Sequence, residues 1–316
     1  MRIFRLRPEE RSLASKSFLH PGRHGFERVR ALPTPAVSFS LPFPLPSRCT
    51  WVAIEEENIS HWNDFTFQNI FNAFGDILDR SVVSDYSAEG IDPVHVRFSS
   101  DIRALGVSHF FPLLRSPISE GSRVLGERLG CVFQAVDAGE EQTVRSRGRN
   151  LRCSLSFHFN QMGQTYLVAS GVRGSRSWHS DDLVNMVPFS TAPISQVATY
   201  SEAYRTRYTF MLTDEEVVVA RVFYGDDGKY RVEWKAIPWS ASGDNTLTVS
   251  LAIWTLVMMS LNDNYRRVRH RRNTPPLNLW WRYHNPAGDV YYQHHLSMRR
   301  RSNLPSGAVC RDGPST

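Results

Sequence analysis

A carboxylate and a lysine with the spacing of a phosphate-processing site occur on one predicted strand of this 316-residue chain. Glu233 and Lys235 are two residues apart, so on a strand both side chains point to the same face. Asp214 precedes the neighbouring predicted strand and would add a second carboxylate. Two carboxylates can hold a hard cation such as magnesium, and a lysine beside them can orient the attacking water. The pattern predicts magnesium-dependent phosphodiester hydrolysis by Asp214, Glu233 and Lys235.

The same residues also have a purely structural interpretation. An acid and a lysine on one face of a half-exposed strand often form only a solvated surface pair. Asp214 lies in Thr213-Asp214-Glu215, where a tight turn favours a side chain that bonds its own backbone. Lysine is nevertheless scarce, because Lys16 and Lys229 are the only others in the chain. We favour the structural interpretation and keep the catalytic one as the alternative.

The strands that would carry these residues form a predicted meander. Runs rich in β-branched and aromatic residues occur at Tyr208–Leu212 and Val217–Tyr224, and the turn Gly225-Asp226-Asp227-Gly228 leads into Tyr230–Ile237. An apolar helix is predicted from Leu247 to Leu261. At about fifteen residues it is shorter than a bilayer span. The pattern indicates a core helix and no membrane partner.

Short strings around this meander carry a family resemblance. They lie between residues 150 and 310 and are Ile194-Ser195-Gln196, Arg207-Tyr208, Leu212 to Val219, Ile237-Pro238-Trp239, Leu247-Thr248-Val249, Leu251 to Trp254 and Tyr292-Gln293-His294-His295. With these strings the chain resembles a group of fungal proteins of the PD-(D/E)XK nuclease-like superfamily. The resemblance implies an α/β (α+β) fold in which a mixed β-sheet is flanked by helices, with a restriction-endonuclease-like core.

The resemblance also implies which elements build that core. One mixed sheet should contain strands 151–159, 164–173, 208–212, 217–224 and 230–237, and the helices containing Gln196 and residues 247–261 should pack against it.

The resemblance places the family's acid-x-lysine motif on the strands 151–159 and 164–173, but the acids are missing there. Cys153 stands in place of the first acid, and Gly171 and Arg173 stand in place of the second acid and the lysine. Arginine cannot be deprotonated and does not replace a lysine point charge. The resemblance therefore implies a degraded site without metal, formed by Cys153, Gly171, Arg173 and Gln196.

Positive charge gathers directly after the predicted core helix. The formal net charge is +6 and the sequence pI about 9.3, so the chain should attract polyanions at low salt. The arginine run at 266–272 is also typical of nuclear-localisation signals. The densest run predicts a DNA- or RNA-binding patch that contains Arg266, Arg267, Arg269, Arg271 and Arg272.

Aromatic residues follow this run and lead to a second basic run, 299–301. Bases could stack on Trp280, Trp281, Tyr291 and Tyr292 beside phosphate contacts. Alternatively, these rings pack a C-terminal hairpin, turning at Asn285–Asp289, onto the core. We favour the packing interpretation.

Other signatures of enzymes and metal sites are weak. His294 and His295 are adjacent, and on a strand they would point to opposite faces and could not bind one ion together. Residues 171–175 lack the glycine spacing and lysine of a phosphate-binding loop, and no G-x-S-x-G string occurs. We therefore predict no metal site and no cofactor, with magnesium needed only if Glu233 and Lys235 are catalytic.

Four regions are predicted along the chain. Residues 1–47 form an Arg- and Pro-rich disordered arm, 48–150 a helical lead-in and loop-rich region with a short helix at 119–129, 151–310 the nuclease-like core with its hairpin, and 311–316 a tail. The cysteines lack C-x-x-C spacing, which indicates an intracellular protein, nuclear or cytoplasmic. The arm also resembles a mitochondrial transit peptide, but Pro8-Glu9-Glu10 interrupts the pattern.

Three functions follow. The missing acids favour a non-catalytic nuclease-like domain that binds nucleic acid or a protein partner. The first alternative is an active magnesium-dependent nuclease that uses Asp214, Glu233 and Lys235. The second is a structural or interaction protein that does not bind nucleic acid.

Overall fold

The computed structural model describes residues 51–79, 98–140, 142–146, 148–159, 165–185, 187, 190–243, 245–286 and 288–313. The predicted N-terminal arm, the turn at 160–163 and the end of the tail lie outside these ranges. The helices are α2 (Phe67–Leu78), α3 (Ser99–Leu105), the π-helical turn η3 (Gly106–Phe110), α4 (Phe111–Leu129), α5 (Asp181–Val184), α6 (Ala192–Ala203), α7 (Val249–Leu261) and α8 (Asp263–Arg266), with 3-10 turns η2 (Glu56–Asn58) and η4 (Arg271–Asn273).

The strands are β1 (Ile59–His61), β2 (Val136–Glu140), β3 (Thr143–Ser146), β4 (Arg149–Arg152), β5 (Leu155–Phe159), β6 (Thr165–Val172), β7 (Tyr208–Leu212), β8 (Glu216–Tyr224), β9 (Tyr230–Pro238), β10 (Leu279–His284), β11 (Val290–His294), β12 (Arg300–Arg301) and β13 (Val309–Asp312).

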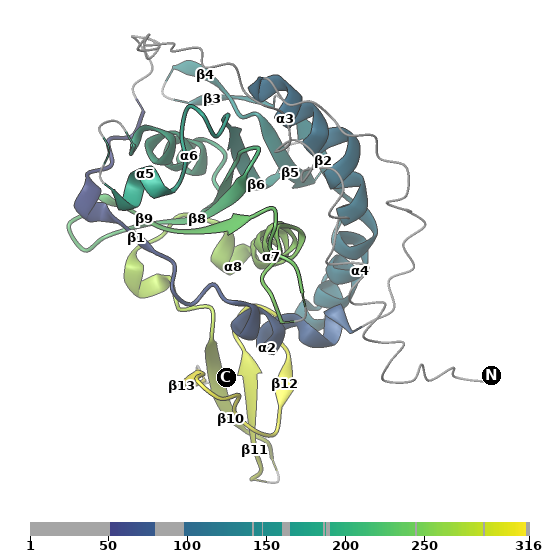
Figure 1. The fold of residues 1–316 in the computed structure, drawn as a ribbon. Coiled ribbons are helices and arrows are strands. Elements are labelled where there is room, and N and C mark those ends of the chain that lie inside the picture. The colour runs from purple at the N-terminus through teal and green to yellow at the C-terminus, as the bar shows by residue number, and fades with distance from the viewer. Residues whose placement is uncertain are drawn as a thin grey trace.

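A seven-stranded mixed sheet forms the centre of the molecule, in the order β1-β9-β8-β7-β6-β5-β2. The pairs β1–β9 and β6–β7 are parallel, and the other neighbours are antiparallel. Helices cover both faces of this sheet (Figure 1). The prediction of a mixed β-sheet flanked by helices is thereby confirmed.

One predicted strand of this sheet is interrupted. The segment expected to run from 151 to 159 is divided at Cys153, so β4 pairs with β3 in a separate two-stranded sheet while β5 joins the main sheet. Cys153 leaves the ladder because its N–H donates to Gln142 O at 3.1 Å and to the Tyr204 hydroxyl at 2.9 Å. The prediction of one continuous strand is wrong at this position.

Alternating side chains of β8 divide the core between the two faces. Val217 and Val219 pack with α7, whereas Val218, Ala220 and Val222 pack with residues of α6. Because both faces are covered, the strand needs apolar residues at nearly every position. This explains the uninterrupted run that the sequence shows at 217–220.

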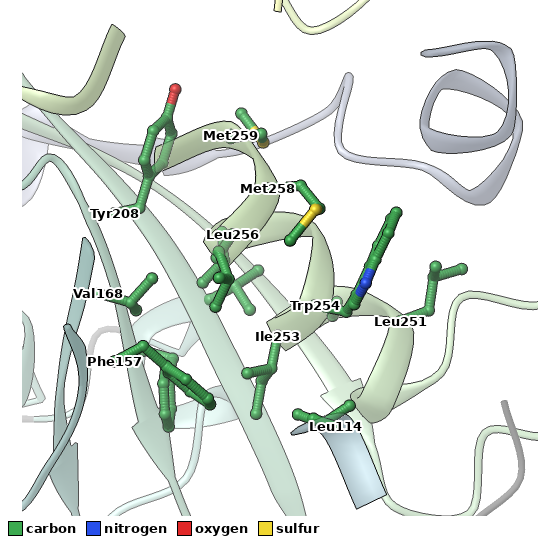
Figure 2. Packing of buried hydrophobic residues seen from close by; sticks show 14 of the residues in the cluster. Leu114, Phe157, Val168, Tyr208, Leu251, Ile253, Trp254, Leu256, Met258 and Met259 are labelled. Carbon is green, nitrogen blue, oxygen red and sulfur yellow. The ribbon is translucent and has the colours of Figure 1, made fainter. Parts of the chain in front are cut away.

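Helix α7 lies between the central sheet and α4 (Figure 1), and it is buried along its entire length. The Thr248 hydroxyl caps it by accepting from Leu251 N at 3.3 Å. Ile253 and Leu256 point toward the strand residues Phe157 and Val168 (Figure 2). No helix in the described ranges has both the length and the apolar character of a membrane span.

The second side of α7 is covered by α4, which the sequence predicts only in part. Helix α4 begins at Phe111, not at Ser119, and it follows directly on α3 and η3 in the region predicted to be rich in loops. The Trp254 indole of α7 donates to Pro117 O at 3.1 Å. This contact uses a backbone carbonyl in the middle of α4 to join the two helices.

A smaller four-stranded sheet, in the order β12-β11-β10-β13, projects from the main body (Figure 1). Strands β10 and β11 are antiparallel, and β13 runs parallel to β10. Trp280 and His294 lie at its root, where the His294 ring centre is 6.1 Å from that of Phe74 in α2. The root of this sheet is therefore part of the hydrophobic core.

Close approach of α4 to α7 depends on Gly121. A Cβ at this position would lie 2.5 Å from Met258 Sδ and 3.2 Å from Trp254 Cζ2. We expect Gly121→Val to lower the free energy of unfolding by about 1–3 kcal/mol through overpacking. Urea denaturation of the full chain would measure this.

The matched control is Ser119→Val, which places the same side chain on the exposed face of α4. That change should stay within about 0.5 kcal/mol of the wild type. Equal losses in the two variants would contradict the close packing of α4 on α7.

Candidate functional site

The four residues of the predicted degraded site lie together on the α6 side of the sheet. Gln196 Oε1 accepts from Arg173 Nη2 at 2.6 Å. Gln196 Nε2 donates to the Tyr200 hydroxyl at 2.7 Å, and this hydroxyl donates to Arg152 O at 3.0 Å. A Cβ at Gly171 would lie 3.8 Å from Gln196 Cδ. A chain of hydrogen bonds thus connects the end of β6 to the end of β4 through α6.

Cys153 is the buried end of this cluster. Burial raises the pKa of its thiol, so the thiolate that a nucleophile or metal ligand requires is disfavoured. At the other end, Arg173 Nε is buried without a hydrogen-bond partner in the described part of the chain. The cluster offers a positive charge and amide and hydroxyl groups, which suit an anion better than a cation.

Asp214 binds backbone and hydroxyl groups close to this cluster. Its Oδ1 accepts from Ser175 N at 2.6 Å and its Oδ2 from Ser175 Oγ at 2.9 Å. The buried carboxylate of Glu216 similarly accepts from Ser180 N at 2.7 Å and Ser180 Oγ at 2.8 Å. Together the two acids fasten the segment 175–180 across the ends of β6 and β7.

Glu233 is engaged by a buried arginine. Arg221 Nε donates to Glu233 Oε2 at 3.0 Å, and Arg221 Nη2 bonds the same oxygen. The guanidinium lies 4.8 Å from the ring centre of Trp62 and also bonds Pro275 O at 3.1 Å. The side chain of Arg221 is only 7% exposed, and its charge is compensated mainly by Glu233, with Asp64 Oδ1 farther away at 3.8 Å.

The structure does not bring Asp214 and Glu233 together. Glu233 lies opposite Arg221, whereas Asp214 precedes Glu216, the first residue of β8. At about 3.4 Å per strand residue the two carboxylates are more than about 15 Å apart. Lys235 lies beside Glu233 on β9 and shares its face of the sheet. The three residues do not form one site in this geometry.

The two adjacent histidines are closer together than the sequence predicts. Strand β11 ends at His294 and His295 begins the following turn, so their ring centres are 4.9 Å apart. The expectation of opposite faces is wrong because it assumed a continuing strand. In the described ranges, no group of three or more His, Cys, Asp and Glu side chains could hold a metal ion.

Hydrogen bonds assign the neutral form of His294. Its Nε2 lies 2.7 Å from Leu277 O, and its Nδ1 lies 3.2 Å from Ser297 N. Because a carbonyl only accepts and an N–H only donates, Nε2 carries the proton and Nδ1 accepts. Burial lowers the pKa of His294 to about 4.

Four of the five predicted patch arginines lie on the surface. Arg267, Arg269, Arg271 and Arg272 are exposed, and within the described residues no ion pair engages any of them. Arg266 is different, because its side chain is 9% exposed and pairs with Asp263. The predicted patch is therefore corrected to the other four arginines.

Backbone contacts fix the course of this basic segment, defined as residues 266–274. Arg207 N donates to Arg266 O at 2.6 Å, Arg207 Nε to Arg267 O at 2.8 Å and Arg207 Nη1 to Thr274 Oγ1 at 3.1 Å. Tyr224 N donates to Arg269 O at 2.9 Å. The segment is thus held against the end of the central sheet.

Sequence reasoning missed three residues that organise these sites, namely Arg207, Glu216 and Arg221. Each is a buried charge within or beside an apolar strand. A charged residue in such a run requires a partner, which is the available signal. The identity of the partner depends on strand register, which the sequence alone does not reveal.

The pairing of Glu233 yields a prediction that separates a structural role from a catalytic one. Glu233→Gln removes the nearer of the two carboxylates that compensate Arg221, so the free energy of unfolding should fall by about 2 kcal/mol. The control Lys235→Gln changes the neighbouring member of the acid-x-lysine pair. Its free energy of unfolding should be lower than that of the wild type by less than about 0.5 kcal/mol. Similar effects of both changes in urea denaturation would contradict the assigned pairing.

The buried His294 predicts a dependence of stability on pH. Its folded pKa of about 4 lies below the ordinary value of 6.5, so the unfolded chain binds the proton more readily. The contribution of neutral His294 to the free energy of unfolding is complete above pH 6.5. It decreases by about 3 kcal/mol as the pH falls toward 4. His294→Gln should make this part of the pH profile of unfolding less steep, although the buried His295, whose pKa is also lowered, still contributes to it. His284→Gln, on the exposed part of β10, should leave the profile unchanged. Parallel profiles for both variants would contradict the assignment.

Comparisons of the chain with known proteins give no match. No protein-family model, no curated protein and no solved structure matches the chain.

Proposed function

We propose that this protein is a non-catalytic α/β domain that binds nucleic acid through its basic segment. The observation that carries the proposal is the exposure of Arg267, Arg269, Arg271 and Arg272 on one fixed segment without acidic partners among the described residues. Phosphate backbones bind such groups through counterion release, independently of base sequence. Backbone anchoring at Arg207 supports the proposal, since it holds the arginines close together.

The proposal includes a restriction-endonuclease-like core whose catalytic groups are replaced. Its support is the parallel pair β6–β7 with α6 between them in sequence, and the contact of Arg173 with Gln196. In the alternative of an active nuclease, Asp214 and Glu233 would hold magnesium. Both carboxylates have other partners, since Asp214 binds Ser175 and Glu233 binds Arg221. Binding without cleavage is the function that these contacts favour.

Salt dependence tests the binding surface directly. We expect the full-length protein to bind a labelled DNA duplex with an affinity that falls steeply as salt rises. Arg271→Gln with Arg272→Gln should reduce the slope of log K against log salt by about 1.8, since each phosphate contact in duplex DNA contributes about 0.9. Fluorescence anisotropy at several salt concentrations provides the measurement.

A double variant on a distant surface provides the control. Arg115→Gln with Arg123→Gln removes the same charge from the exposed side of α4 and should leave the slope unchanged. An equal reduction in both pairs would mean that only net charge matters, and the basic segment would not be the binding site. Magnesium-dependent cleavage of the duplex that survives in repurified protein would contradict the non-catalytic part of the proposal.

A further inference from the structure

The two faces of the small C-terminal sheet differ in chemistry. Strand register places Tyr283 opposite Tyr291, Trp281 opposite Gln293 and Arg311, and Gln293 opposite Arg300, so these side chains share one face. We call it the tyrosine face. The reverse face contains Trp280 and His294 at the root, and farther out Tyr292 and the ion pair of Arg282 with Asp312.

Aromatic rings and arginines form a row across the tyrosine face. The rings of Tyr283 and Tyr291 are 5.5 Å apart and inclined by only 18°. The Arg300 guanidinium lies 5.2 Å from the centre of the Tyr291 ring. On the other side, the Tyr283 ring occupies the space that a side chain at Gly313 would need, 2.3 Å from a Cβ there. The row therefore extends across β12, β11 and β10 and ends against Gly313, directly after β13.

The charges that the strand register assigns to this face are of one sign, and Asp289 lies outside the register, directly before β11. Arg300 and Arg311 are exposed, and no described position that the register assigns to the face is acidic. A row of aromatic rings flanked by arginines is the combination that binds unpaired bases and the phosphates between them. A neutral apolar partner would leave the two arginines without anions.

The tyrosine face adjoins the basic segment. Tyr265, in α8 directly before Arg266, forms a hydrogen bond with the Trp281 side chain of this face. A flexible chain can therefore cross from the exposed arginines of the segment to the rings of the sheet. A rigid duplex presents its bases only at its ends and cannot use these rings in this way.

We infer that the tyrosine face binds single-stranded nucleic acid, with bases on Tyr283 and Tyr291 and phosphates on Arg300 and Arg311. The inference rests on the proposed function and adds the ligand class and a second contact surface. The basic segment then supplies affinity for any nucleic acid, and the tyrosine face supplies the preference for unpaired strands.

The test compares a labelled oligothymidine with a duplex of the same length and the full-length protein at one salt concentration. The wild type should bind the single strand more tightly. Tyr283→Leu with Tyr291→Leu should weaken single-strand binding by about tenfold or more, because each stacked base contributes substantially. Duplex affinity and both salt slopes should stay unchanged, since no charge is removed.

Two further variants protect the test from a folding artefact. Tyr283→Phe with Tyr291→Phe retains the rings and should retain the preference, and Tyr292→Leu alters the reverse face of β11 and should also retain it. Loss of single-strand binding in the Leu pair but not in these controls supports the inference, provided that thermal unfolding shows each variant folded.

The outcomes distinguish the inference from the proposed function. Binding of both nucleic acids without any effect of the Leu pair overturns the inference and leaves the proposed function standing. No binding of either ligand by the wild type overturns both. Binding of polyglutamate with the same dependence on the two tyrosines would show a general polyanion site and also overturns the inference.

Discussion

The fold depends on covering α7 from every side. All residues from Val249 to Leu261 are buried, so this helix has no face that water can solvate. The central sheet covers one side and α4 another, while Leu277 and Leu296, on either side of the β10–β11 hairpin, belong to the same core. Segments distant in sequence must therefore close around α7 before it is stable. The root of the small sheet is fixed by this requirement, and the basic segment that connects α8 to the sheet is fixed with it.

How far the sequence predicts this architecture depends on how local each signal is. The meander and α7 are readable because hydrophobic runs and turn residues lie close together, although α7 begins at Val249 and Thr248 is its N-cap. The first part of α4, before Ser119, is missed because Pro117 disfavours a helix interior, and contacts with α7 override that propensity. The break at Cys153 is missed because its partner, Tyr204, is distant in sequence.

The candidate sites also combine features that are local in sequence with features that depend on contacts between distant residues. Adjacent arginines are visible in the sequence, but the burial of Arg266 beside its exposed neighbours depends on how α8 packs. The register between β8 and β9 separates Asp214 from Glu233. Without this register, Asp214 and the acid-x-lysine pair look like parts of one site. Acids that look available in the sequence are used internally to hold a loop or neutralise a buried arginine. Such internal pairing leaves the surface arginines with an excess of positive charge.

Arg207 gives the basic segment a further property. Its guanidinium is buried, burial lowers its pKa, and it holds both ends of the segment through Arg267 O and Thr274 Oγ1. A loop tied at both ends has already lost much of its conformational entropy when the protein folds. Less ordering then remains to oppose the proposed association with nucleic acid. A buried side chain in this way fixes the surface segment on which the proposed binding of nucleic acid depends.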